Sequence, residues 1–381
     1  MAIYQAQTST LSQPWSVRMA DSVMRRYMPF CWHYEYGLMH RAIEQVWLKT
    51  SNSKFYHYIK RDIDQLVSAE GNIETYSVQE YNLDQINPGR ILFPLYRTTG
   101  DEKYKKAAYL LREQLRGQPR TSEGGFWHKK IYPHQMWLDG IYMAAPFCAE
   151  FAKTFDEPAA FDDVAHQIIL IERHTRDRKT GLLYHGWDES KQQRWAKPET
   201  GCSPHFWGRA VGWYAMAIVD VLDYLPQDHA KRQDILAIFE RMIAALVNVQ
   251  DKATGLWYQV LDQGNRKGNY LEASGSCMFV YSIAKAVRQG YLSKTCLDIA
   301  HKGYQGILDN LIRVDDQGLV NLEKVCSVAG LGGTPYRDGS YEYYVNEKIA
   351  TNDYKGVGPF ILASIEMENA ATEMAGPVIY R

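Results

Sequence analysis

The sequence predicts an all-α fold, specifically an (α/α)6 barrel built from six helical hairpins. Apolar residues recur at helical spacing along nearly the whole chain, and similar glycine-containing linkers return at intervals of roughly 55 to 75 residues. The chain has no sustained strand alternation and no regular βαβ order, which argues against a parallel sheet. We therefore expect residues 1–381 to form a single barrel domain.

The helical elements follow from their periodicity. After the N-cap residue Asp101, five apolar residues share one helix face: Tyr104, Ala107, Ala108, Leu111 and Leu115. The same pattern predicts about twelve helices, over Trp15–Met28, Glu35–Lys49, Ser53–Ser68, Ile86–Arg97, Asp101–Arg116, Gln135–Lys153, Ala159–Thr175, Trp207–Tyr224, Asp228–Gln250, Ser274–Gln289, Ser293–Ile312 and Lys355–Ala371.

The linkers indicate how these helices pair. Four similar strings each precede a polar loop and then a helix: Gly125-Phe126-Trp127, Gly181-Leu182-Leu183-Tyr184, Gly255-Leu256-Trp257 and Gly318-Leu319-Val320. Six hairpins can close into a ring whose alternate helices line the centre. The long loops then gather at one mouth, where we expect the binding chemistry.

Charge and cysteine content narrow the classes of function. Lysine and arginine total 43 against 44 acidic residues, and the net charge of −1 gives no field that favours nucleic acid or anionic lipid. The six cysteines lie far apart and form no CxxC pair, and the segment Met1–Trp15 lacks the features of a secretory signal. No later stretch is apolar enough to span a bilayer. We expect a cytoplasmic protein that binds neither nucleic acid nor membranes.

Aromatic content is high, with 27 tyrosines and 10 tryptophans. Such rings can stack on the flat faces of sugars, or they can fill a core.

Two aspartates are candidates for acid–base chemistry. Asp139 lies in an apolar helical start beside Trp137 and Tyr142, and apolar surroundings favour the protonated form that a general acid needs. Its alternative role is a capping or buried, hydrogen-bonded carboxylate. Asp84 precedes a predicted helix in YNLDQINPGR, where it would either face Asp139 as a second carboxylate or cap the helix.

Candidate binding residues surround these aspartates. Arg209 stands between Trp207 and Trp213 at a helix start, where it would hold a sugar carboxylate or remain an ordinary arginine with a buried stem. His128 and His185 would contact hydroxyl groups or serve as structural histidines.

Other chemistries find no support in the motifs. The sequence contains no HExxH, P-loop or GxSxG motif, and its histidines lack metal-ligand spacing, so we expect neither a metal nor a nucleotide cofactor. The string GLGGT at Gly330–Thr334 predicts a tight loop at the mouth.

Three strings, YPHQMWLDGIYMAAPF, SPHFWGRAVGWYAM and VCSVAGLGGTPYRDGSYEYY, strongly resemble family 105 glycoside hydrolases, the unsaturated rhamnogalacturonyl hydrolases. The similarity runs from about Trp15 to Ala371, and the unsaturated glucuronyl hydrolases of family 88 share part of the pattern. By motif, the resemblance implies that Asp139 is the catalytic acid/base and Asp84 its supporting carboxylate. It also implies these substrate contacts: Trp32, Tyr34, His128, Trp137, His185, Trp207, Arg209 and Trp213.

The resemblance further implies a cofactor-free enzyme acting on an oligosaccharide. Its substrate would be the unsaturated galacturonic acid that a lyase leaves on rhamnogalacturonan. Asp139 would protonate C4 of the C4=C5 double bond and then assist the addition of water to C5, after which the sugar ring opens and expels the second sugar.

Several alternatives remain at this stage. They are an unsaturated glucuronyl hydrolase acting on glycosaminoglycan disaccharides, an inverting glycosidase that uses both aspartates, a sugar epimerase that uses His128 and His185, and a non-catalytic sugar-binding protein.

Overall fold

The computed structural model describes residues 13–375, so the two ends of the predicted domain and most of the segment Met1–Trp15 lie outside the described residues. Within that range the α-helices are α2 (Trp15–Arg25), α3 (Tyr34–Thr50), α4 (Ser53–Leu66), α5 (Leu92–Thr99), α6 (Glu102–Gly117), α7 (Leu138–Thr154), α8 (Ala160–Thr175), α9 (Gly208–Val221), α10 (Arg232–Asn248), α11 (Ala273–Arg288), α12 (Leu297–Asn310), α13 (Tyr341–Asn346) and α14 (Tyr354–Ala375).

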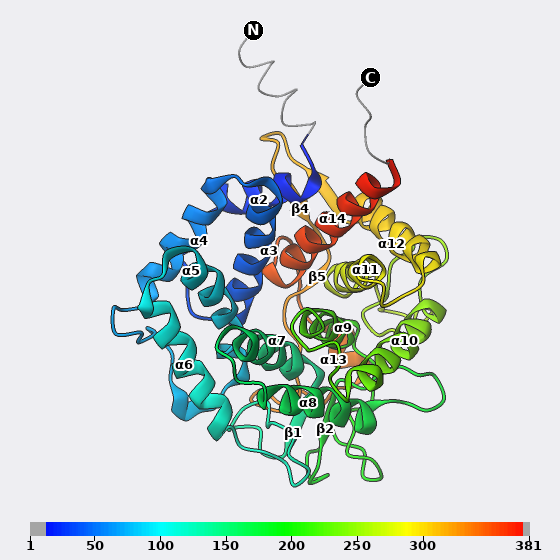
Figure 1. The fold of residues 1–381 in the computed structure, drawn as a ribbon. Coiled ribbons are helices and arrows are strands. Elements are labelled where there is room, and N and C mark those ends of the chain that lie inside the picture. Colours follow the sequence, from blue (N-terminus) through cyan, green and yellow to red (C-terminus); the bar gives the residue numbers. More distant parts are fainter. Residues whose placement is uncertain (1–12, 376–381) are drawn as a thin grey trace.

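These helices form two concentric rings, which confirms the predicted (α/α)6 barrel (Figure 1). In the inner ring α3 packs against α14, α14 against α11, α11 against α9, and α9 against α7. The 3-10 helix η3 (Asn87–Ile91), which leads into α5, closes this ring between α7 and α3. The outer helices α2, α4, α6, α8, α10 and α12 alternate with the inner ones along the chain.

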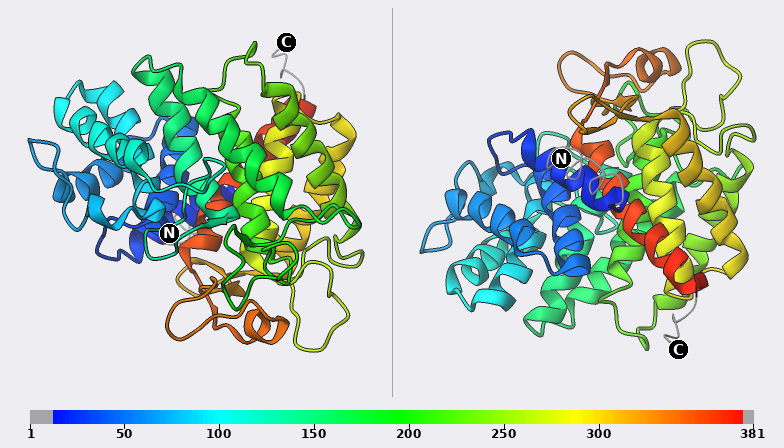
Figure 2. Two further views of the ribbon diagram at one scale, coloured as in Figure 1. Left: turned by 90° about the horizontal axis from the view of Figure 1, so that it is seen from below. Right: turned by 90° about the horizontal axis from the view of Figure 1, so that it is seen from above.

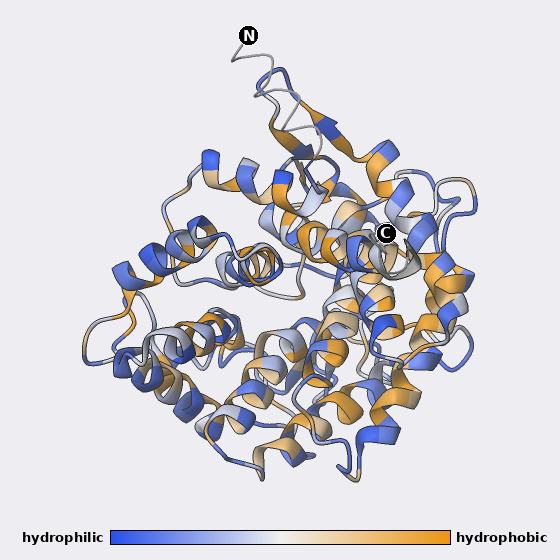
Figure 3. Ribbon diagram, turned by 45° about the horizontal axis from the view of Figure 1, so that its top comes forward, coloured by the Kyte–Doolittle hydropathy of each residue, from blue (hydrophilic) through white to orange (hydrophobic). Residues whose placement is uncertain are grey.

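Burial explains which helices lie inside. Every residue of α9 is buried, and so is nearly all of α7, because other inner helices and an outer helix surround each of them. In α6, the five apolar residues that define its predicted face are buried and its opposite face is charged. Figure 3 shows the same division, with hydrophilic segments concentrated on the peripheral helices and the loops.

The recurring linkers form the same turn after successive outer helices. Asp177 and Asp251 each accept hydrogen bonds from a threonine three residues later, through both its N–H and its hydroxyl group. Gly181 and Gly255, at φ +78° and +77°, then reverse the chain. A left-handed conformation favours glycine, and this repeated geometry accounts for the glycines in the linker pattern.

Several predicted helices begin differently from the sequence-based expectation. The range Ser293–Ile312 begins as the 3-10 helix η4 (Lys294–Cys296) before α12, and α10 starts at Arg232 rather than at Asp228. The range Ile86–Arg97 splits into η3, which has Pro88 in its first turn, and α5. The range Gln135–Lys153 begins as strand β1 (Gln135–Trp137), which pairs antiparallel with β2 (Gly186–Asp188), before α7 starts at Leu138.

Two further short sheets occur, and the sequence analysis did not predict them. They pair β3 (Ile312–Val314) with β4 (Val320–Leu322), and β5 (Val325–Cys326) with β6 (Ile349–Ala350). These strands and α13 project from one end of the barrel (Figure 2). Among residues 13–375, no helix combines the length and hydrophobicity needed to cross a bilayer.

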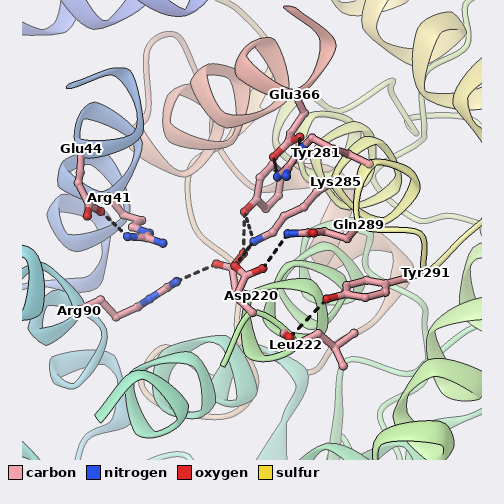
Figure 4. Close-up of polar contacts among 12 residues, drawn as sticks. Arg41, Glu44, Arg90, Asp220, Leu222, Tyr281, Lys285, Gln289, Tyr291 and Glu366 are labelled. Carbon is pink, nitrogen blue, oxygen red and sulfur yellow. Dashed lines mark hydrogen bonds and ion pairs between the residues drawn. The ribbon is translucent and has the colours of Figure 1, made fainter. Parts of the chain in front are cut away.

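A layer of buried charges fills the barrel toward the carboxyl ends of the inner helices (Figure 4). Asp220 accepts hydrogen bonds from Arg90 Nη1 at 2.9 Å, Lys285 Nζ at 2.8 Å and the Tyr281 hydroxyl at 2.6 Å. Burial acts to raise the pKa of Asp220, but Lys285 and Arg90 hold it well below its ordinary value. This ionic layer joins three inner elements, η3, α9 and α11, across the barrel.

Candidate active site

A cavity of about 180 Å³ lies at the opposite mouth, where the inner helices begin. It is smaller than the roughly 300 Å³ typical of a site for a drug-sized ligand, so it suits one small ring. Five of the residues singled out from the sequence line it: Tyr34, Asp84, His128, Trp137 and Asp139. The other lining residues are His33, Glu35, Lys129, Tyr132, Met143, Val328, Ala329 and Arg337.

Asp139 lies in the first turn of α7 and is 8% exposed. The N-cap of α7 is Trp137, so Asp139 does not cap the helix. The β1–β2 pairing places His185 Nε2 3.2 Å from Asp139 Oδ2. The two atoms nevertheless do not form a hydrogen bond, and both are buried without a partner among the described residues. The Asp139 residue also lines the cavity, so its carboxyl group is placed to exchange a proton with a ligand there.

His185 is fully buried, and its orientation is fixed from the other side. Its Nδ1 lies 2.8 Å from the hydroxyl of Tyr344, whose pKa burial raises well above its ordinary value. The hydroxyl therefore keeps its proton. The imidazole is thus held with Nε2 directed at Asp139.

Asp84 has a different environment from Asp139. It lies in the 3-10 helix η2 (Leu83–Gln85), where Asn82 supplies the capping oxygen, so the capping alternative for Asp84 is wrong. Lys129 Nζ is 2.5 Å from Asp84 Oδ2, and His128 Nε2 is 3.5 Å from Oδ1. Burial acts to raise the pKa of Asp84, but Lys129 and then His128 lower it below its ordinary value. Asp84 is therefore ionised near neutral pH.

Three rings form a column along one wall of the cavity. Trp137 stacks on His128 at 4.5 Å and on Tyr132 at 4.9 Å, measured between ring centroids. Both faces of Trp137 are thus covered, so only its edge can reach a ligand. Burial lowers the pKa of His128 to about 4, although Asp84 acts to raise it, and the imidazole is neutral at pH 7.

The remaining predicted binding residues lie outside the cavity lining. Trp213 stacks on Tyr142 with ring centroids 4.9 Å apart, and Trp207 donates a hydrogen bond from Nε1 to Gln259. Arg209 is 1% exposed and donates to the carbonyl oxygens of Cys326 and Ser327. Of these three, Trp213 also contacts the lining residue Tyr34, with ring centroids 6.0 Å apart.

Trp32 also lies outside the cavity lining. Its Nε1 donates a 2.8 Å hydrogen bond to the carbonyl oxygen of Gln85, which fixes the segment that carries Asp84. Substrate contact by Trp32, His185, Trp207, Arg209 and Trp213 stays a prediction.

Several lining residues were not predicted from the sequence, and two of them carried a detectable signal. Lys129 directly follows His128, and Arg337 stands three residues beyond the GLGGT string. A basic residue next to a candidate site loop is a reasonable anion ligand. Glu35, Met143 and Val328 gave no comparable signal. Within residues 13–375, no three histidine, cysteine, aspartate or glutamate side chains are arranged to hold a metal ion.

Two buried carboxylates in different environments lie at the mouth of the helical barrel, an arrangement typical of hydrolases that use acid–base chemistry. Comparison with known proteins identifies the family. The model of Glycosyl Hydrolase Family 88 matches residues 15–371. A solved family 105 glycoside hydrolase from C. acetobutylicum ATCC 824 is 49% identical, with a TM-score of 0.92 over 94% of this chain and 100% of that one. The chain therefore belongs to the glycoside hydrolases that the family 88 model matches, and within them it is similar to family 105.

Two curated proteins are also similar to this chain. Protein Atu3128 of Agrobacterium fabrum is 40% identical over 230 residues, covering 59% of this chain and 97% of its own length. The unsaturated rhamnogalacturonyl hydrolase YesR of Bacillus subtilis is 27% identical over 309 residues, covering 79% of this chain and 82% of its own length.

Proposed function

We propose that this enzyme removes unsaturated galacturonic acid from the end of lyase-generated rhamnogalacturonan oligosaccharides. The observation that carries the proposal is the contrast between two aspartates in one cavity. Asp84 is held ionised by Lys129, whereas Asp139 Oδ2 is buried and unpartnered. This contrast supplies one carboxyl group that can transfer a proton and one that remains a hydrogen-bond acceptor. Membership of family 105 and the resemblance to YesR support the substrate class.

The first step is proton transfer from Asp139 to C4 of the substrate. The C4=C5 π electrons form the new C4–H bond, and the ring oxygen stabilises the positive charge that develops at C5. Asp139 becomes an anion in the first turn of α7, where the helix dipole stabilises negative charge. The cation and the new carboxylate therefore form together within the cavity.

Water then adds to C5. Its oxygen forms the C5–O bond, and one of its protons returns to Asp139, which restores the acid for the next cycle. The resulting hemiketal opens to a ketone at C5. The hemiacetal left at C1 then collapses and releases the second sugar. Ionised Asp84 orients the substrate hydroxyl groups or the water through hydrogen bonds.

Replacing Asp139 tests this role. We expect Asp139→Asn to abolish the loss of ultraviolet absorbance of the conjugated alkene while calorimetry still detects disaccharide binding. The matched control is Asp309→Asn, an exposed aspartate on α12, which should keep full activity. Substantial turnover by Asp139→Asn would reject the proposal. Unsaturated glycosaminoglycan disaccharides, assayed in parallel, separate this activity from that of glucuronyl hydrolases.

We also propose a cytoplasmic location. All six cysteines are unpaired in the structure, four of them buried, and thiols persist in a reducing compartment.

A further inference from the structure

The GLGGT string leads into a closed loop, Gly332–Arg337, beside the cavity. Gly332 and Arg337 exchange backbone hydrogen bonds of 2.8 and 3.1 Å, which close the loop between them. Gly332 and Gly333 turn the chain at φ +66° and +79°, a conformation that strains other residues. The loop therefore delivers one side chain, Arg337, to the cavity lining.

The guanidinium of Arg337 is held rigidly but is only partly occupied. Its Nε donates to Gly332 O at 2.9 Å, and its Nη2 donates to the Tyr132 hydroxyl at 2.9 Å. Its Nη1 has no acceptor among the described residues. Gly330 permits this placement, since a Cβ at that position would lie 2.4 Å from Nη1. A fixed guanidinium with a free N–H edge is preorganised for an oxyanion.

Charge pairing around the cavity singles out the same residue. Lys129 is paired with Asp84, and the nearby Lys355 is paired with Glu35. Burial lowers the pKa of His33, so its imidazole is neutral at pH 7. Within the described part of the chain, Arg337 has no carboxylate within salt-bridge distance, and its acceptors are all uncharged oxygens. It is thus the lining cation whose charge is not neutralised by the protein.

We propose that Arg337, rather than Arg209, binds the carboxylate of the unsaturated uronic acid. The carboxylate accepts a hydrogen bond from Arg337 Nη1, and its second oxygen accepts one from the Tyr132 hydroxyl, whose proton is not used by Arg337. Arg209 lies outside the cavity lining and donates to backbone carbonyls instead. This assignment rests on the proposed function and names the residue that selects an anionic substrate.

The test compares binding of the unsaturated disaccharide as the free acid and as its methyl ester. Calorimetry on Asp139→Asn should show tighter binding of the acid by about 10- to 100-fold, the range for a charge-assisted hydrogen bond. Adding Arg337→Gln should bring the two affinities within about threefold, mainly by weakening the acid. Arg194→Gln, which removes an exposed arginine over Tyr336 beside this loop, should leave the preference intact.

Three outcomes would overturn the assignment. They are an unchanged acid preference after Arg337→Gln, an equal loss of affinity for acid and ester, and no binding of the acid. The proposed function fails separately, if the wild-type protein binds the free acid but does not turn it over.

Discussion

The pairing of Lys129 with Asp84 leads to a quantitative prediction for Lys129→Met. The variant keeps most of the apolar stem but removes the ammonium group 2.5 Å from Asp84 Oδ2. His128, the next contributor, is neutral at pH 7 because its pKa is about 4, so it cannot replace the lost charge. Without the ammonium group, less positive charge counteracts the effect of burial, so the pKa of the Asp84 carboxyl group rises.

The magnitude follows from the geometry. The Lys129 side chain is 21% exposed and that of Asp84 9%, so solvent screens the pair only partly. An opposite charge at this distance lowers a carboxyl pKa by about 1 to 3 units, and each unit corresponds to roughly 1.4 kcal/mol. If Asp84 must be ionised for turnover, the acid limb of kcat/KM should move to higher pH by about 1 to 2 units.

The assay is the pH profile of kcat/KM on the lyase-generated disaccharide. Lys130→Met is the matched control, because Lys130 is adjacent and exposed and has no carboxylate partner in the described structure. The pair should also stabilise the fold above about pH 4, the ordinary pKa of aspartate, and lose this effect as pH falls through the lowered pKa of Asp84. An unshifted acid limb in Lys129→Met would refute the reasoning.

Two further predictions concern buried groups. Asp220→Asn leaves Arg90 and Lys285 without their shared carboxylate. We therefore expect it to lower the free energy of unfolding, measured by urea titration, by about 3 to 5 kcal/mol. A loss below about 1 kcal/mol would show that this ionic layer contributes little. His128, with its pKa lowered to about 4, should give neutral imidazole shifts in nuclear magnetic resonance spectra from about pH 5.5 to 8, and a titration near pH 6.5 would contradict its burial beside Trp137.

The sequence predicted the barrel because helix periodicity is a local property. The apolar face after Asp101 and the linkers at Gly181 and Gly255 each specify their own geometry within a few residues. The start of α7 was misplaced for the opposite reason. Residues Gln135–Trp137 form a strand only because β2, about fifty residues later in the chain, pairs with them.

The site was predicted in part for a similar reason. Asp139 and Asp84 could be singled out from their local context, and both line the cavity. The choice of Arg209 as the carboxylate ligand relied on the two neighbouring tryptophans. Both rings are buried outside the cavity lining, and the guanidinium donates to backbone carbonyls. Which cation faces a ligand depends on long-range packing, and Arg337 reaches the cavity from a loop far along the chain.

The same environment that singles out Asp139 also explains why one residue can serve both steps. Its carboxyl group lines the cavity, and the helix start behind it would stabilise the carboxylate that the proposed proton transfer forms. Attack by water at C5 requires no displacement at the anomeric carbon. The double bond is therefore an essential part of the proposed substrate.

The most direct test compares two disaccharides of a uronic acid linked to rhamnose, one unsaturated, from a lyase, and one saturated, from a hydrolase. Release of rhamnose is measured by chromatography with equal amounts of wild-type enzyme. The account predicts that rhamnose appears only from the unsaturated disaccharide, together with loss of the alkene absorbance. Release of rhamnose from both disaccharides at similar rates would contradict it.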